Sequence, residues 1–252
     1  MNRIATRQSE IALDLESRIT LDFDQDATSR TPPRSATYIP LHYESGYAYP
    51  LIVWLPGRGE TENVLAEVMP KVSLRNYLGI SLRGPLTGAR DQGLSWDLSL
   101  DGALDAAEAI EGCVTAMCRR FNVAPHRVFI AGHADGGTLA TQIALASPGV
   151  FAGAASLGGA LPRGDAPLSG LNQKRDLEVL LAQGRDADGY TEDDVCDDLR
   201  LLHYAGINVT LRQYPHGDEL SDLMLADLNR WAMQLVTGHV ESTPRPQPHE
   251  VN

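Results

Sequence analysis

Short apolar runs alternate with longer amphipathic segments along most of this chain. Residues 49–55 form a continuous apolar run that Pro56 and Gly57 end, which is typical of a strand buried on both faces of a mostly parallel sheet. From Leu104 to Phe121, apolar residues recur at three- and four-residue spacing, the pattern of a long amphipathic helix. Strands and helices that alternate in this way predict βαβ units and a doubly wound, mostly parallel sheet of the α/β class.

The same patterns predict the other elements. Strands are expected at 35–45 (an edge strand), 79–83, 128–132, 151–157, 178–182 and 209–213. Further helices are expected at 61–74, 138–147, 193–204 and 220–236.

The ends of the chain differ from its middle. Residues 1–34 are polar and predict a lead-in segment, whereas 241–252 hold three prolines and few apolar residues and predict a disordered tail. A single folded domain is therefore expected over residues 35–240, and a chain of 252 residues suits one α/β domain.

Charge and composition narrow the function classes. A net charge of −12 argues against nucleic acid or an anionic membrane as a partner. The N-terminal residues contain no apolar stretch long enough for a signal peptide or a membrane span, so a cytoplasmic protein is expected. The three cysteines, Cys113, Cys118 and Cys196, are too few for a disulfide framework in a chain of this size.

One short segment carries the strongest chemical signal. Residues 128–137 have the pattern of a buried strand, a sharp glycine turn and the start of a helix, which is the setting of a G-x-S-x-G nucleophile elbow. Gly132 and Gly136 flank the tip, where a tight backbone leaves no room for side chains. The tip itself is Ala134, and a methyl group cannot attack a carbonyl carbon.

Four further landmarks flank this elbow in a characteristic order. They are L-P-G-R-G at 55–59, R-G-P at 83–85 with S-W-D at 95–97, Q-G-R-D-A-D at 183–188 and Q-Y-P-H-G-D-E at 213–219. Together with the elbow they resemble the phospholipase/carboxylesterase family of α/β-hydrolases, which includes the acyl-protein thioesterases. The resemblance covers about residues 48–236 and implies a single-domain α/β-hydrolase fold.

The resemblance also implies where the catalytic groups of that family would fall. Its chemistry needs a serine nucleophile, a histidine base, a carboxylate that orients the histidine, and two backbone N–H groups that stabilise the oxyanion. The corresponding positions are Ala134 for the serine, Asp218 for the histidine, Asp186 (or Asp188 if the loop is offset) for the acid, and Arg58 and Asp135 for the N–H donors. Pro56 replaces the usual histidine of the oxyanion loop.

Two of the three catalytic side chains are thus absent. An exposed aspartate at 218 is too weak a base to replace imidazole, and it would repel Asp186. The sequence therefore favours a pseudo-hydrolase, a binding or regulatory protein whose partner is a small ester-like molecule or another protein. The alternative is an active hydrolase, cleaving an ester or thioester bond, that uses a non-standard residue or a metal.

Several residues near the elbow bear on that alternative. His133 is expected to pack beside the tip, and Ser156 to be a strand-end serine. Asp135 as the nucleophile would require the elbow to slide by one residue, which would put His133 where a small residue is needed. His216 precedes the expected histidine position by two residues and would need to swing inward to activate water.

A metal is the remaining alternative. Carboxylates with one imidazole suit a divalent cation. The side chains that could supply such ligands are those of Asp186, Asp188, Asp218 and His216. Their spacing matches no metal motif, so neither a metal nor a cofactor is expected.

Overall fold

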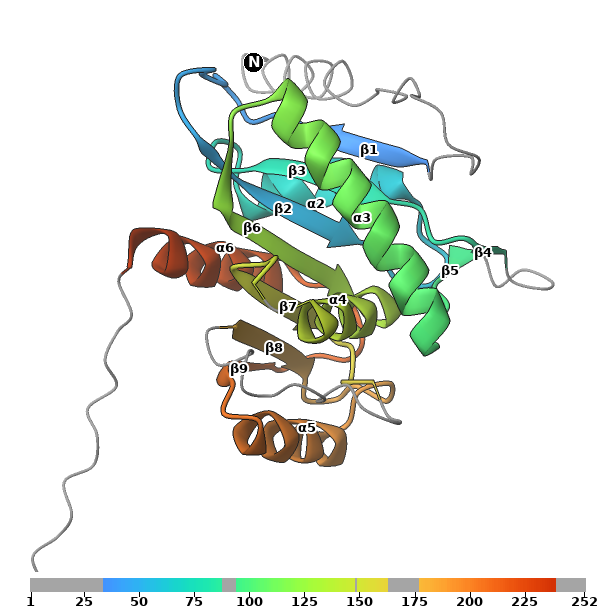
Figure 1. Cartoon of the computed structure of the whole chain (residues 1–252). Helices are drawn as coiled ribbons and strands as arrows, with labels where there is room; N and C mark the ends of the chain where they lie inside the picture. Colours follow the sequence, from blue (N-terminus) through green and yellow to red (C-terminus); the bar gives the residue numbers. More distant parts are fainter. Residues whose placement is uncertain (1–33, 88–93, 148, 163–176, 239–252) are drawn as a thin grey trace, which may run out of the picture.

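A computed structural model describes residues 34–87, 94–147, 149–162 and 177–238 (Figure 1). The lead-in predicted for 1–34, apart from Arg34, and the tail predicted for 241–252 lie outside the described residues.

A seven-stranded sheet with the order β1-β3-β2-β6-β7-β8-β9 forms the middle of the molecule. Only the β1–β3 pair is antiparallel, and every other pair is parallel. Its strands are β1 (Ser35–Tyr38), β2 (Tyr49–Leu55), β3 (Leu78–Leu82), β6 (Val123–His133), β7 (Gly153–Leu157), β8 (Glu178–Gly184) and β9 (Asn208–Tyr214). The doubly wound, mostly parallel sheet predicted from the sequence is confirmed. A small hairpin of β4 (Leu86–Thr87) and β5 (Leu94–Ser95) was not predicted.

The first strand is shorter than predicted. An edge strand was expected over 35–45, but β1 ends at Tyr38. Pro40 has no N–H to give to a ladder, and His42 adopts a φ of 58°, so the chain turns away from the sheet there. The 35–45 prediction was therefore wrong over most of its length.

Helices cover both faces of the sheet (Figure 1). On one face lie α3 (Leu100–Arg120), α4 (Asp135–Ala146) and α5 (Glu192–Tyr204), and on the other lie α2 (Leu65–Val72) and α6 (Asp222–Thr237). A short 3₁₀ turn, η1 (Glu62–Val64), precedes α2, so the helix predicted for 61–74 begins in this tighter form.

Alternation along β2 explains the two layers. Leu51, Val53 and Leu55 pack with the α3 side, whereas Ile52 and Trp54 pack with the α2 side. All seven residues of β2 are buried, as the apolar run predicts for a central parallel strand.

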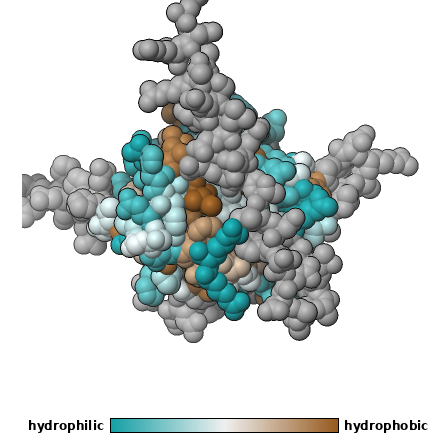
Figure 2. Space-filling view, turned by 90° about the horizontal axis from the view of Figure 1, so that it is seen from above, coloured by the Kyte–Doolittle hydropathy of each residue, from teal (hydrophilic) through white to brown (hydrophobic). Residues whose placement is uncertain are grey.

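Hydrophobic surface is unevenly spread over the one face of the molecule that Figure 2 shows. Figure 2 shows the view from above, in which apolar surface gathers near the middle of the face and hydrophilic surface lies around it. No helix among the described residues is long and apolar enough to cross a membrane.

The strand register sets the position of the functional loops. Leu55 at the end of β2 lies beside Gly132, His133 lies beside Leu157, and Gly184 lies beside Tyr214. Because these parallel strands point the same way, the loops that follow them come together at the carboxyl ends of the strands. This is where α/β folds bind their ligands.

Candidate functional site

Ala134 forms a strained turn between β6 and α4. β6 ends at His133 and α4 begins at Asp135, so Ala134 alone makes the reversal. Its φ of 47° and ψ of −120° lie outside the regions that residues with a Cβ normally adopt. This confirms the predicted elbow geometry, and backbone strain of this kind is a feature of functional sites.

The glycines around the tip are required by close backbone contacts. A Cβ on Gly132 would lie 2.4 Å from the backbone of Gly136, and a Cβ on Gly136 would lie 2.2 Å from the carbonyl oxygen of Leu55. A Cβ on Gly159, after β7, would lie 2.2 Å from the carbonyl oxygen of Ala134. These contacts hold the elbow against the ends of β2 and β7.

Arg58 and Asp135 face each other beside the elbow. The Arg58 Nε donates to the Asp135 Oδ2 at 2.9 Å, and the Ser95 hydroxyl lies 3.5 Å from the same oxygen. Within the described residues, the backbone N–H groups of Arg58 and Asp135 donate to no other group. The ion pair thus joins the two residues whose N–H groups are the expected oxyanion donors, and it also engages the Asp135 carboxylate considered above as a nucleophile.

Two residues that the sequence analysis did not identify fix the loop that carries Arg58. The Glu60 carboxylate accepts a hydrogen bond from the Gly57 N–H at 2.6 Å. The buried Trp96 indole donates to the Pro56 carbonyl at 2.8 Å. The S-W-D landmark contains Trp96, but its role depends on a contact 40 residues away that sequence spacing does not reveal.

Asp218 joins the loops that follow β8 and β9. Its carboxylate accepts hydrogen bonds from the backbone N–H groups of Asp188 at 3.2 Å and Gly189 at 3.0 Å. Its carbonyl oxygen lies 3.0 Å from the His133 Nε2, so residue 218 also reaches the elbow. The structure thus brings the positions 133, 188 and 218 together.

The side chains of Asp186 and Asp188 are both exposed. The Asp186 N–H donates to the His216 carbonyl at 3.0 Å, which ties the acid loop to the β9–α6 loop. Within the described residues neither carboxylate makes a hydrogen bond or an ion pair, so neither orients an imidazole.

His133 packs beside the tip. Its Nδ1 would lie 3.1 Å from a Cβ at Gly57, and its ring would lie 3.8 Å from a Cβ at Gly158. With its Nε2 engaged by Asp218, the ring bridges the loops after β2, β7 and β9.

The His216 ring contacts residues of its own loop and the end of β9. Its Nε2 lies 2.8 Å from the Ser221 Oγ, and its ring stacks on Tyr214 with centroids 5.6 Å apart. Burial, together with a hydrogen bond to Asp227, raises the pKa of the Tyr214 phenol above its ordinary range. Ser221 was not among the predicted site residues, because it pairs with His216 only through the fold of this loop.

Ser156 makes a strand-end contact, as expected. It is fully buried and its hydroxyl donates to the Gly159 carbonyl at 2.6 Å. Across the described part of the chain, no three histidine, cysteine, aspartate or glutamate residues are arranged to hold a metal ion.

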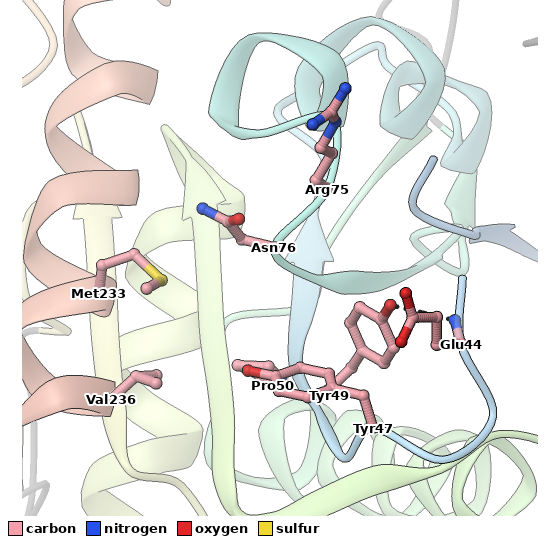
Figure 3. Close-up of a pocket in the computed structure, with 8 residues that line it drawn as sticks. All are labelled: Glu44, Tyr47, Tyr49, Pro50, Arg75, Asn76, Met233 and Val236. Carbon is pink, nitrogen blue, oxygen red and sulfur yellow. Dashed lines mark hydrogen bonds between the residues drawn. The ribbon is translucent and has the colours of Figure 1, made fainter. Parts of the chain in front are cut away.

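A pocket of about 250 Å³ lies elsewhere, between the start of β2 and the end of α6 (Figure 3). Tyr49 and Pro50 begin β2 there, whereas the elbow lies beyond the last residue of that strand. This pocket therefore lies at the amino-terminal end of β2, whereas Ala134 lies near the carboxyl ends of the strands.

Comparison with known proteins places the fold. A scan against models of protein families and a sequence search of curated proteins found no match. Solved structures do match. The carboxylesterase of Mesorhizobium loti has a TM-score of 0.69 at 18% identity, covering 86% of this chain and 99% of its own.

The chain has the α/β-hydrolase fold. Arabidopsis thaliana SOBER1 matches with a TM-score of 0.64 at 20% identity, over 75% of this chain and all of its own. Zea mays acyl-protein thioesterase 2 matches with a TM-score of 0.61 at 17% identity, over 81% of this chain and 99% of its own. Two of these three structural neighbours are a carboxylesterase and an acyl-protein thioesterase, which is the group that the sequence landmarks resemble.

Proposed function

We propose that this chain is a pseudo-hydrolase, a binding or regulatory protein derived from the phospholipase/carboxylesterase family that has lost the nucleophile at Ala134 and the base at Asp218. The observation that carries the proposal is the pair of hydrogen bonds that the Asp218 carboxylate accepts from the 188–189 backbone. A carboxylate held in this way stabilises a loop, and it is too weak a base to take the place of an imidazole.

The two backbone N–H groups expected to form the oxyanion site support a binding role. The N–H groups of Arg58 and Asp135 have no acceptor within the described residues, and backbone donors do not depend on side-chain identity. The ligand we propose is a small ester-like molecule whose carbonyl oxygen accepts from these groups; a protein partner at the same edge is the second option. The acid position is assigned to Asp186 or Asp188.

All three cysteines are free thiols, which fits a reducing compartment. A cytoplasmic location is therefore part of the proposal.

The decisive experiment is steady-state hydrolysis of p-nitrophenyl esters. We expect no multiple turnover by the unmodified protein. The double variant Ala134→Ser/Asp218→His should gain weak turnover and each single variant much less, because triad members act as a unit. Multiple turnover by the homogeneous unmodified protein would overturn the proposal.

An active hydrolase with a non-standard nucleophile is the second candidate. The observation that favours it is the 2.8 Å contact between His216 and Ser221.

A further inference from the structure

The loop between β9 and α6 brings a serine hydroxyl and an imidazole together outside the elbow. The Ser221 Oγ lies 2.8 Å from the His216 Nε2. Among the described residues, no other serine or threonine hydroxyl lies within hydrogen-bond distance of a histidine ring nitrogen. A serine in contact with a base is the basic unit of nucleophilic catalysis.

The groups around the other ring nitrogen decide which atom holds the proton. The His216 Nδ1 lies 3.1 Å from the Gly217 carbonyl oxygen and 3.7 Å from the Glu219 Oε1. Both are acceptors, so the neutral ring keeps its proton on Nδ1. Its Nε2 then has a free lone pair, and the Ser221 hydroxyl must donate to it. This is the tautomer that a general base needs.

Ser221 also begins α6, and this role is compatible with reactivity. Its Oγ accepts from the Met224 N–H at 3.4 Å through a lone pair, which leaves the hydroxyl proton for His216. The N–H groups of Asp222 and Leu223 have no acceptor within the described residues. They lie in the first turn of a 16-residue helix, where the helix dipole favours negative charge.

The imidazole is held in place and is mostly shielded. Only 15% of the His216 side chain is exposed, and it stacks on Tyr214, whose hydroxyl is held by Asp227 at 2.8 Å. Ser221 is half-buried at the surface, so a substrate can reach the hydroxyl while the base stays positioned behind it.

We infer that Ser221 is an acyl-accepting serine, with His216 as its general base and activated carboxylic esters as its substrate class. The Ser221 Oγ attacks the ester carbonyl carbon and its proton passes to the His216 Nε2. The bond between the carbonyl carbon and the alcohol oxygen then breaks, and Nε2 returns the proton to that oxygen. The products are an ester on Ser221 and a free alcohol, with no oxidation or reduction.

This inference rests on the second candidate function, for which it names the nucleophile, the base and the substrate class, and it uses no elbow residue. Its observable event is the acylation of Ser221, which the burst of released alcohol and the label on the serine report.

The test combines p-nitrophenyl acetate with a fluorophosphonate probe and peptide mass spectrometry on the full chain. We expect a burst of about one equivalent of p-nitrophenol and a label on Ser221. The His216→Gln variant should label roughly a hundredfold more slowly, the usual contribution of a general base.

Two variants distinguish the reactivity of the Ser221 hydroxyl from its role as the N-cap of α6. Ser221→Asn removes the nucleophile but keeps a good helix cap, so the fold should survive and the label should disappear. Ser99→Ala is the matched control, because Ser99 caps α3 through the Gly102 N–H at 3.1 Å and contacts no histidine. Its labelling should equal that of the unmodified protein.

An absence of label, a label at another residue, or labelling of Ser221 that His216→Gln leaves unchanged would each overturn the inference. None of these results depends on Ala134, so the pseudo-hydrolase proposal stands or falls separately.

Discussion

The Asp218 carboxylate accepts a hydrogen bond from the Gly189 backbone N–H at 3.0 Å. In the family that this sequence resembles, a histidine at this position donates a hydrogen bond to the catalytic acid, which corresponds here to the loop after β8. Here the direction is reversed, because the side chain accepts and the loop backbone donates. The Asp218 carboxylate thus connects the loop after β9 to the loop after β8.

Removing this contact should loosen the site and lower stability modestly. We expect Asp218→Ala to reduce the free energy of unfolding by about 1 kcal/mol, because two hydrogen bonds to a charged acceptor are lost at an exposed position. Denaturant unfolding would measure the change. Asp186→Ala is the control, since the Asp186 carboxylate is exposed and makes no hydrogen bond within the described residues. Equal losses in the two variants would show that the Asp218 contacts add no stability.

Two helical glycines should respond in opposite ways to the same substitution. In Gly136→Ala the new Cβ would lie 2.2 Å from the Leu55 carbonyl oxygen, so we expect a loss of about 3 kcal/mol or failure to fold. Gly112→Ala in α3 meets nothing within 4 Å, so it should stabilise the protein by roughly 0.5–1 kcal/mol through helix propensity. Thermal unfolding of both variants tests the close packing of the elbow, and a tolerated Gly136→Ala would contradict it.

The strain at Ala134 predicts a stabilising glycine. With φ at 47° and ψ at −120°, the Cβ of Ala134 is costly, and strain of this kind amounts to about 1–3 kcal/mol. Glycine removes that strain but adds roughly 0.5–1 kcal/mol of backbone entropy cost, so Ala134→Gly should raise stability by about 1 kcal/mol. Ala140→Gly inside α4 has no strain to relieve and should lower it. A loss of stability in Ala134→Gly would mean that the elbow is not strained.

The cysteines should differ in reactivity toward a thiol reagent. Burial raises the pKa of the Cys113 thiol to about 11 from 9.0, so near pH 8 its thiolate fraction is roughly a hundredfold below that of a thiol with the ordinary value. Cys196 is exposed and should react fastest. Burial raises the pKa of Cys118 to a lesser extent, and we expect an intermediate rate. A reagent that releases a coloured thiolate would follow the three phases, and the variant Cys113→Ser should lack only the slowest.

The sequence by itself determined the order of the elements and the elbow. The apolar run of β2, the helical periodicity of α3 and the glycines on either side of Ala134 are local patterns, each set by neighbouring residues through pleat, helix pitch or backbone crowding. These patterns required no knowledge of distant contacts. The length of the edge strand was mispredicted because it depends on a distant contact. The alternation over 35–45 does not show where β1 loses its partner β3.

Only the tertiary structure decided which side chains meet at the site. The Asp218 carboxylate reaches Gly189 across 29 residues, Trp96 reaches Pro56 across 40, and Arg58 reaches Asp135 across 77. The pairing of His216 with Ser221 spans five residues, yet it depends on how the loop leaves β9 and on the ring of Tyr214 beneath the imidazole. Such contacts follow from the register of parallel strands and from the turns that end them. The sequence pattern predicts which segments lie at the carboxyl ends of the strands. The packing of these segments decides which of their atoms are in contact.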